Sequence, residues 1–228
     1  MKLPLIKTAV FLSIIALAIA GTGCAKQLLN NVPGKHATKA ESKKMSIKII
    51  LGSTRKGRTS DKLGSALELM AKKRNDVAVE ILDLRDFNLP FLNDEVPPAR
   101  REKITDPAVQ RWADKINEAQ GFIIVVPEYN AGYPGVLKNA LDILYKEWNG
   151  KTVAFVGYSG GSSGGSSAIA QLRQVAAGLE MVTVATDIKI PSAWKAFDTK
   201  GNLENKNIES ELNTLIDQVI ATRTAAKK

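Results

Sequence analysis

The sequence has almost no thiol or imidazole groups. Its single Cys (Cys24) and single His (His36) both lie among the first 44 of 228 residues. The rest of the chain therefore has no Cys nucleophile, Ser-His-Asp triad, His general base or Cys and His ligands for zinc. It has no disulfide either. We expect no metal site, and any enzymatic chemistry would come from a cofactor.

An excess of one charge is also missing over most of the chain. The formal net charge is +9, but residues 1–44 contain seven Lys and one acidic residue. The other 184 residues therefore carry 25 basic and 22 acidic side chains, a net charge of +3. Because nucleic-acid binding needs a strongly basic surface, this balance argues against it.

No apolar run has the length of about 20 residues that a spanning helix needs. The longest, Ala9–Ala20, follows Lys2 and Lys7 and precedes small residues. A basic tip, a short apolar run and small residues are typical of a secretory signal peptide, which we predict over residues 1–24.

The signal peptide has two possible processing sites. Cleavage after Ala20 is one, and a lipoprotein box ending at Cys24 is the other, although Gly21 stands where an aliphatic residue is usual. Residues 25–45 are polar and Lys-rich, as in a tether. We expect a protein of the cell envelope or periplasm, and the lipoprotein box would anchor it to the membrane through lipidated Cys24. The alternative is a cytoplasmic protein whose translation starts at Met45.

Five apolar runs alternate with amphipathic segments over residues 46–222. The runs are nearly continuous and rich in β-branched residues, as in strands buried on both faces. They are Ile47–Leu51, Val77–Leu82, Phe122–Val126, Val153–Val156 and Val182–Ile188. Helical stripes lie between them, one of which includes Leu137, Leu141, Leu144 and Trp148. The alternation predicts an α/β fold, a doubly wound parallel five-stranded sheet with helices on both faces, followed by a basic tail over 223–228.

Ligands of such sheets bind beyond the carboxyl ends of the strands, so three loops are candidate sites. The first loop, residues 52–60 (GSTRKGRTS), follows the first strand. It offers main-chain N–H groups, hydroxyls, two Arg and a helix N-terminus, a combination typical of phosphate binding. The alternative is a helix capped by Thr59 or Ser60 with solvated charges.

The first loop also nearly matches a P-loop. Gly52 and Gly57 have the required spacing, with Arg58 in place of the Lys and Thr59 in place of the Mg²⁺-binding hydroxyl. However, the third strand ends in VVPEYN, without the expected Asp. A P-loop-like nucleotide hydrolase is therefore a minor alternative.

Two further loops suit a flat ligand. The second loop, residues 127–135 (PEYNAGYPG), combines two Tyr, two Pro and two Gly in a rigid, aromatic edge. The third loop, residues 157–167, consists almost entirely of Gly and Ser. Because it joins a buried strand to an amphipathic helix, it favours close backbone approach to a ligand over a flexible linker.

The three loops together resemble the NADPH-dependent FMN reductase family, which includes NAD(P)H:quinone reductase-like flavoproteins. GSTRKGRTS, PEYNAGYPGVLKNALD and GYSGG carry this resemblance, which extends over residues 46–222. It implies a flavodoxin-like fold with sheet order 2-1-3-4-5 and non-covalently bound FMN. The third loop departs from the family pattern, because it is longer and richer in Ser.

The resemblance also implies which residues contact FMN. The phosphate would be bound by Ser53, Arg55, Thr59 and Ser60. The isoalloxazine would be lined by Pro127, Glu128, Tyr129 and Asn130, and closed on its other edge by Ser159, Gly160 and Gly161.

The implied function is an FMN-dependent oxidoreductase. Hydride would pass from NADPH or NADH through FMN to a quinone, flavin, azo dye or metal oxyanion. Backbone N–H groups of the third loop are candidates to stabilise charge near flavin N1 and O2. Arg100 and Arg101 would contact a 2′-phosphate or form a solvated charge pair. A flavodoxin-like electron carrier without NAD(P)H activity is the alternative.

The same resemblance suggests a homodimer or homotetramer in which a neighbouring subunit covers the flavin, with a small molecule as electron acceptor. Trp194 is a candidate for that interface. Trp112 and Trp148 lie on helical core stripes, so we expect both in the interior.

Overall fold

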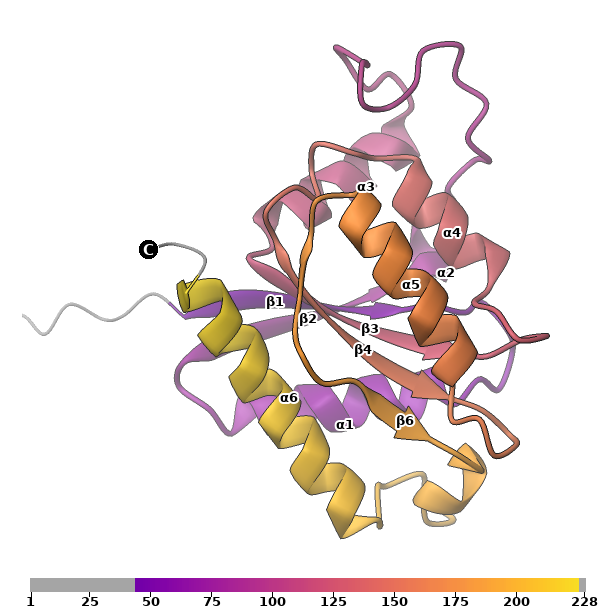
Figure 1. Cartoon of the computed structure of the whole chain (residues 1–228), viewed down its shortest axis with the longest axis vertical. Helices are drawn as coiled ribbons and strands as arrows, with labels where there is room; N and C mark the ends of the chain where they lie inside the picture. The colour runs from indigo at the N-terminus through magenta and orange to yellow at the C-terminus, as the bar shows by residue number, and fades with distance from the viewer. Residues whose placement is uncertain (1–43, 226–228) are drawn as a thin grey trace, which may run out of the picture. The chain divides into compact units, whose positions relative to one another are not determined.

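Six parallel strands form the centre of the computed structural model, which describes residues 44–225 (Figure 1). The predicted signal peptide, Cys24 and most of the tether lie outside these described residues. The strands are β1 (Met45–Leu51), β2 (Val77–Asp83), β3 (Gly121–Pro127), β4 (Thr152–Tyr158), β5 (Val182–Thr183) and β6 (Ile188–Ile190). Their order is β2-β1-β3-β4-β5, and β6 also pairs with β4. The expected flavodoxin-like fold and order 2-1-3-4-5 are confirmed.

Helices cover both faces of the sheet. On one face lie α1 (Ser60–Lys72) and α6 (Lys206–Ala225); on the other lie α3 (Pro107–Glu118), α4 (Gly135–Asp142) and α5 (Ser166–Gly178) (Figure 1). Two short helices, α2 (Leu84–Phe87) and η1 (Ala193–Ala196), complete the described elements. No helix within residues 44–225 is long and apolar enough to cross a membrane.

Residue alternation along the central strands explains this two-faced arrangement. In β3, Phe122 and Ile124 pack with α3, α4 and α5, while Ile123 packs with α1 and α6. Since side chains of a strand point alternately to opposite faces, a continuous apolar run supplies both cores. Trp112 and Trp148 are fully buried in the first of these cores, with ring centroids 6.1 Å apart, as expected.

The prediction of one continuous fifth strand over Val182–Ile188 is wrong. The chain leaves the sheet between β5 and β6, where Arg173 of α5 donates to Val184 O at 2.8 Å and to Asp187 Oδ1 at 2.8 Å. At Val184 the backbone N–H still donates to Val153 O of β4 at 3.0 Å, while the Val184 carbonyl accepts from the guanidinium of another element. An apolar run alone carries no sign of such a partner.

Two helix boundaries also differ from expectation. The stripe that ends at Trp148 predicts a longer helix, but α4 ends at Asp142. Trp148 Nε1 donates to Leu141 O at 3.1 Å, so it occupies a carbonyl near the helix end and remains in the core. At the other end of the chain, α6 continues to Ala225, into the segment predicted as a basic tail.

Candidate functional site

The three candidate loops meet at the carboxyl edge of the sheet. Gly52 N–H donates to Val125 O at 2.9 Å, and Glu128 N–H donates to Tyr158 O at 3.0 Å, so the sheet ladder continues into the loops. Between the loops lies a cavity of about 390 Å³. Its lining consists of Arg55, Gly57, Arg58, Thr59, Pro127, Glu128, Tyr129, Tyr158, Ser159, Gly160, Ala193 and Trp194. We call it the loop cavity.

Arg58 supports the first loop from inside. Its side chain is fully buried, and Nε donates to Asp61 Oδ1 at 2.8 Å. Further bonds reach Ser53 O and Asp83 at the end of β2. Burial opposes the charged form of Asp83, but hydrogen bonds from Arg85 and Arg58 outweigh it and lower its pKa to about 2. The Arg58 guanidinium is thus paired with the carboxylates of Asp61 and Asp83, and its role in the first loop is structural.

Arg55 faces the loop cavity and has no ion-pair partner among residues 44–225. Its guanidinium carbon lies 5.6 Å from the centre of the Tyr129 ring, a cation–π distance. Tyr129 is held in turn by a 2.8 Å hydrogen bond between its hydroxyl and that of Ser53. The Ser53 hydroxyl also accepts from Arg55 N–H at 3.2 Å, so Ser53 joins the first two loops.

The N-terminus of α1 has the features of an anion site. Thr59 occupies the N-cap position, but its side chain makes no capping bond, contrary to the capped-helix alternative. Ser60 is fully buried, and no atom of the described residues is a hydrogen-bond partner of its Oγ. Its N–H donates to the Tyr158 hydroxyl at 3.3 Å. A buried hydroxyl without a partner is costly, and a phosphate oxygen at this terminus would supply one.

The second loop contains a tight turn. Tyr129 and Gly132 exchange two backbone hydrogen bonds, while Asn130 and Ala131 both have positive φ, at 51° and 60°. Non-glycine residues seldom adopt this conformation outside turns that require it. The Glu128 carboxylate accepts from Ser167 N–H of α5 at 3.0 Å, which fixes the second loop against the third. The loop backbone is thus rigid.

The third loop is organised around Ser159. Its hydroxyl donates to Gly161 O at 3.0 Å and accepts from Gly164 N–H at 2.9 Å. Gly165, at the start of α5, has φ of +90°, and a Cβ there would lie 2.6 Å from the Cα of Gly157. Only glycine permits this close approach, so the Gly-rich composition has a steric cause.

The structure brings seven of the eleven predicted site residues into the lining of the loop cavity: Arg55, Thr59, Pro127, Glu128, Tyr129, Ser159 and Gly160. Ser53 and Ser60 are buried and lie outside the lining. Asn130 and Gly161 are exposed and do not line it either. Sequence reasoning missed Tyr158 and Trp194 as lining residues. Tyr158 belongs to the buried end of β4, and no sequence pattern links Trp194 to the loops.

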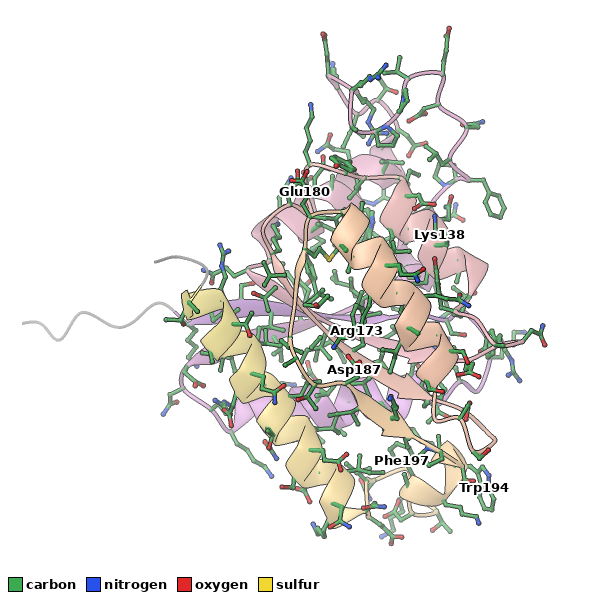
Figure 2. The ribbon with its side chains drawn as sticks, viewed as in Figure 1. Lys138, Arg173, Glu180, Asp187, Trp194 and Phe197 are labelled. Carbon is green, nitrogen blue, oxygen red and sulfur yellow. The ribbon has the colours of Figure 1, made fainter. Side chains whose placement is uncertain are left out.

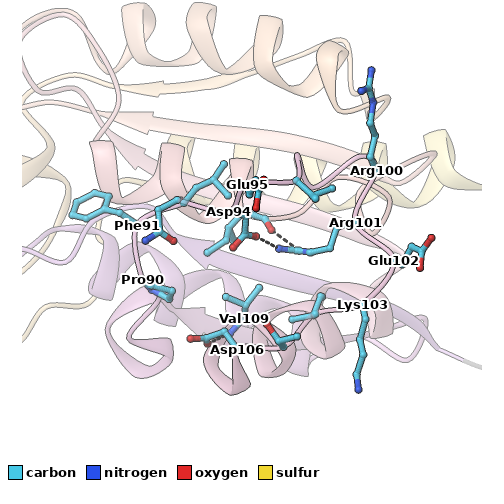
Figure 3. A pocket seen from close by; sticks show the side chains of 16 residues that line it. Pro90, Phe91, Asp94, Glu95, Arg100, Arg101, Glu102, Lys103, Asp106 and Val109 are labelled. Carbon is cyan, nitrogen blue, oxygen red and sulfur yellow. Dashed lines mark hydrogen bonds and ion pairs between the residues drawn. The ribbon is translucent and has the colours of Figure 1, made fainter.

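A larger cavity, of about 750 Å³, lies elsewhere, lined by residues 90–96 and 100–106 together with Val109 and Ile143 (Figure 3). It contains none of the predicted flavin contacts. Arg101 donates to Asp94 at 2.7 Å and to Ile143 O at 2.8 Å, so it is engaged within the protein. Arg100 is exposed. The chemistry of the three loops, and not size, selects the loop cavity as the candidate site.

Comparison with known proteins decides the family. The family model of NADPH-dependent FMN reductases matches residues 45–195, a range that contains all three loops. The chain belongs to the NADPH-dependent FMN reductase family. The match confirms the predicted family and, with it, the predicted class of enzyme: an oxidoreductase with FMN as cofactor and NAD(P)H as reductant.

Individual relatives agree with this assignment. An NAD(P)H-dependent FMN reductase of Nectria sp. is 38% identical over 153 residues, covering 64% of this chain and 75% of the relative. A 2-hydroxy-1,4-benzoquinone reductase of Burkholderia sp. is 30% identical over 183 residues, covering 78% of this chain and 95% of the relative. The structure of FerB, a flavoenzyme NAD(P)H:(acceptor) oxidoreductase from Paracoccus denitrificans, is similar with a TM-score of 0.67 and 26% identity, covering 80% of this chain and 98% of that one.

Proposed function

We propose that this FMN reductase family member binds FMN in the loop cavity and uses NAD(P)H to reduce a quinone or a free flavin. One observation carries the proposal: Arg55, which has no acidic partner in the described part of the chain, faces the same cavity as the N-terminus of α1. A guanidinium and a helix N-terminus together suit the doubly charged phosphate of FMN. A volume of about 390 Å³ lies within the usual range for a cofactor site.

The residues of the site have separate tasks in this proposal. Arg55, Thr59 and Ser60 bind the phosphate, and Ser53 orients Tyr129 through their 2.8 Å hydroxyl contact. The backbones of the second and third loops face the polar rim of the ring and exclude water. The N–H of Gly160, an exposed residue of the lining, would provide a positive dipole where the reduced ring gains negative charge. When bound, FMN supplies the hydride chemistry that the side chains cannot.

The acceptor is the finer part of the proposal. The relatives named quinone reductase, from Burkholderia sp. and Pseudomonas putida, favour a quinone. Azo dyes and metal oxyanions follow from the family resemblance only and are further candidates. The nucleotide hydrolase is disfavoured, because Arg58, the residue in the P-loop Lys position, is buried between two carboxylates.

Titration of FMN against the purified full-length protein and Arg55→Ala tests the phosphate site. Removal of one charge-assisted contact should weaken FMN binding about tenfold or more. Lys56→Ala is the matched control, since Lys56 is an exposed neighbour outside the cavity lining. Equal FMN affinity of Arg55→Ala and the wild type would refute this placement of the phosphate.

Steady-state oxidation of NADPH and NADH with benzoquinone tests the activity itself. We expect turnover with at least one of the two nucleotides. FMN binding without turnover of either nucleotide would favour the electron carrier instead.

A further inference from the structure

Trp194 is an exposed aromatic residue at the loop cavity. It lies on η1 and is 66% exposed, whereas Trp112 and Trp148 are 0% exposed. Figure 2 shows Trp194 near the end of the molecule to which β4 and β6 point. It lines the cavity together with Ala193 and Gly160. An indole is expensive to leave in water, so its position at a cavity needs an explanation.

The backbone of η1 fixes this position. Ser192 N–H donates to Gly161 O at 2.9 Å, and Ala193 N–H donates to Ser159 O at 3.0 Å. Ser192 has φ of 45°, an uncommon conformation for Ser that these bonds maintain. At the other end of η1, Phe197 is 8% exposed and packs in the core shared with α1 and α6. Trp194 is therefore attached to the third loop on a segment held at both ends.

The surroundings of the indole suit a flat anionic ligand. Lys195 Nζ lies 5.1 Å from the centre of the Trp194 ring, which places a positive charge beside it. Arg55 and Tyr129, from the first two loops, also line the cavity. Three aromatic residues, Tyr129, Tyr158 and Trp194, line the cavity. Tyr129 of the second loop and Trp194 of η1 each have a cation beside the ring. Aromatic surfaces of this kind stack on planar heterocycles.

Resting on the function proposed above, we propose that Trp194 contacts the isoalloxazine ring of FMN and contributes directly to its affinity. The attachment of η1 to Ser159 and Gly161 supports the ring as the contact, because the third loop follows β4 on the ring side of the proposed site. Bound FMN would cover the indole, which explains its exposure in the protein alone.

Hydroxyl-radical footprinting with mass spectrometry, with and without FMN, tests the contact. Trp194 should be modified readily in the protein alone and at least about threefold less with saturating FMN. Leu69 of α1 is the internal control, because it is 58% exposed and outside the loop cavity. Trp112 and Trp148 should remain unmodified in both states. Unchanged modification of Trp194 would overturn the proposal, and so would protection that is already complete without FMN, since that would assign the residue to an interface.

Variants test the affinity. Trp194→Ala should weaken FMN binding about 5- to 30-fold, while Trp194→Phe should recover most of the affinity by keeping an aromatic face. Phe91→Leu should bind FMN like the wild type. If the wild type and Phe91→Leu bind FMN and Trp194→Ala binds equally well, this inference fails and the proposed function stands. If the wild type takes up no FMN, the proposed function fails and the inference fails with it.

Discussion

Arg55 and Arg58 lie in the same loop and differ in their surroundings. Arg58 has a fully buried side chain between Asp61 and Asp83, and it connects the loop to the end of β2. Arg55 lines the loop cavity. The two Arg differ because of where the acidic residues lie. Asp83 becomes a neighbour of Arg58 only when β2 pairs with β1. The sequence therefore predicts the cationic loop, but it does not predict which Arg is available to a ligand.

The Asp83 carboxylate should make stability depend on acid pH. Its pKa is lowered from 3.8 to about 2 in the folded protein, so it favours folding when ionised. This contribution, about 2 kcal/mol, is complete above pH 4 and is lost as the pH falls towards 2. Urea unfolding between pH 5 and 2 should show a steeper loss of stability for the wild type than for Asp83→Asn. Parallel pH profiles for the two proteins would contradict the assigned pairing of Asp83 with Arg85 and Arg58.

At the level of elements, the third loop and α5 depend on glycine. Gly157, the residue before the last one of β4, lies beside Gly165 at the start of α5, and neither position has room for a Cβ. This contact brings the third loop close to the sheet edge, where Ser159 organises its backbone. The Gly-rich sequence predicts that the backbone of the third loop approaches a ligand closely. The structure shows that some of these glycines instead allow β4 and α5 to approach each other.

Gly165→Ala should therefore disturb both stability and the site. A Cβ at this position would lie 2.6 Å from Tyr158 N, and the backbone has a positive φ. We expect a loss of about 3 kcal/mol in the free energy of unfolding, together with weaker FMN binding. Gly178→Ala, at the end of the same helix, meets nothing within 4 Å and should be neutral or slightly stabilising. Urea unfolding of both variants measures the difference, and similar losses in the two would show that the clash is relieved elsewhere.

The sequence predicts elements well where local pattern determines them. The first four strands are found within two residues of their bounds. The apolar runs of β1, β3 and β4 are buried on both faces, whereas β2, at the sheet edge, is only partly buried. Prediction fails where a distant side chain decides the structure. Arg173 interrupts the fifth strand, and Trp148 binds the end of α4. In the site, the positions of the three loops are predictable from topology. Trp194 is not predictable, because hydrogen bonds between η1 and the third loop place it at the cavity.

For the whole molecule, residues 88–106 form an extension with exposed apolar side chains. Phe91 and Val96 are 82% and 48% exposed. Asn139 of α4 holds the base of the extension, since its amide donates to Pro90 O at 2.8 Å and accepts from Leu92 N–H at 2.9 Å. Adjacent exposed apolar groups on a charged segment are typical of contacts between proteins. The extension is our candidate for the contact in the predicted homodimer or homotetramer.

Light scattering coupled to size-exclusion chromatography tests this candidate. The wild type should have the mass of a dimer or tetramer, and Phe91→Asp should shift it towards the 24.6 kDa monomer. A buried unpaired carboxylate would penalise the association by several kcal/mol, which is about 100-fold or more in the association constant. Leu69→Asp, on an exposed site of α1, is the control and should retain the wild-type mass. A wild-type monomer would rule out self-association altogether.

The two bonds of Asn139 have a mechanical consequence. They join the base of the extension to α4, and α4 follows directly from the turn that carries Tyr129. Together with the bond from Arg101 to Ile143 O, they connect the extension to α4, a helix of eight residues, and to the residue that follows it. A substitution at Asn139 would therefore disturb both the extension and the helix that follows the Tyr129 turn.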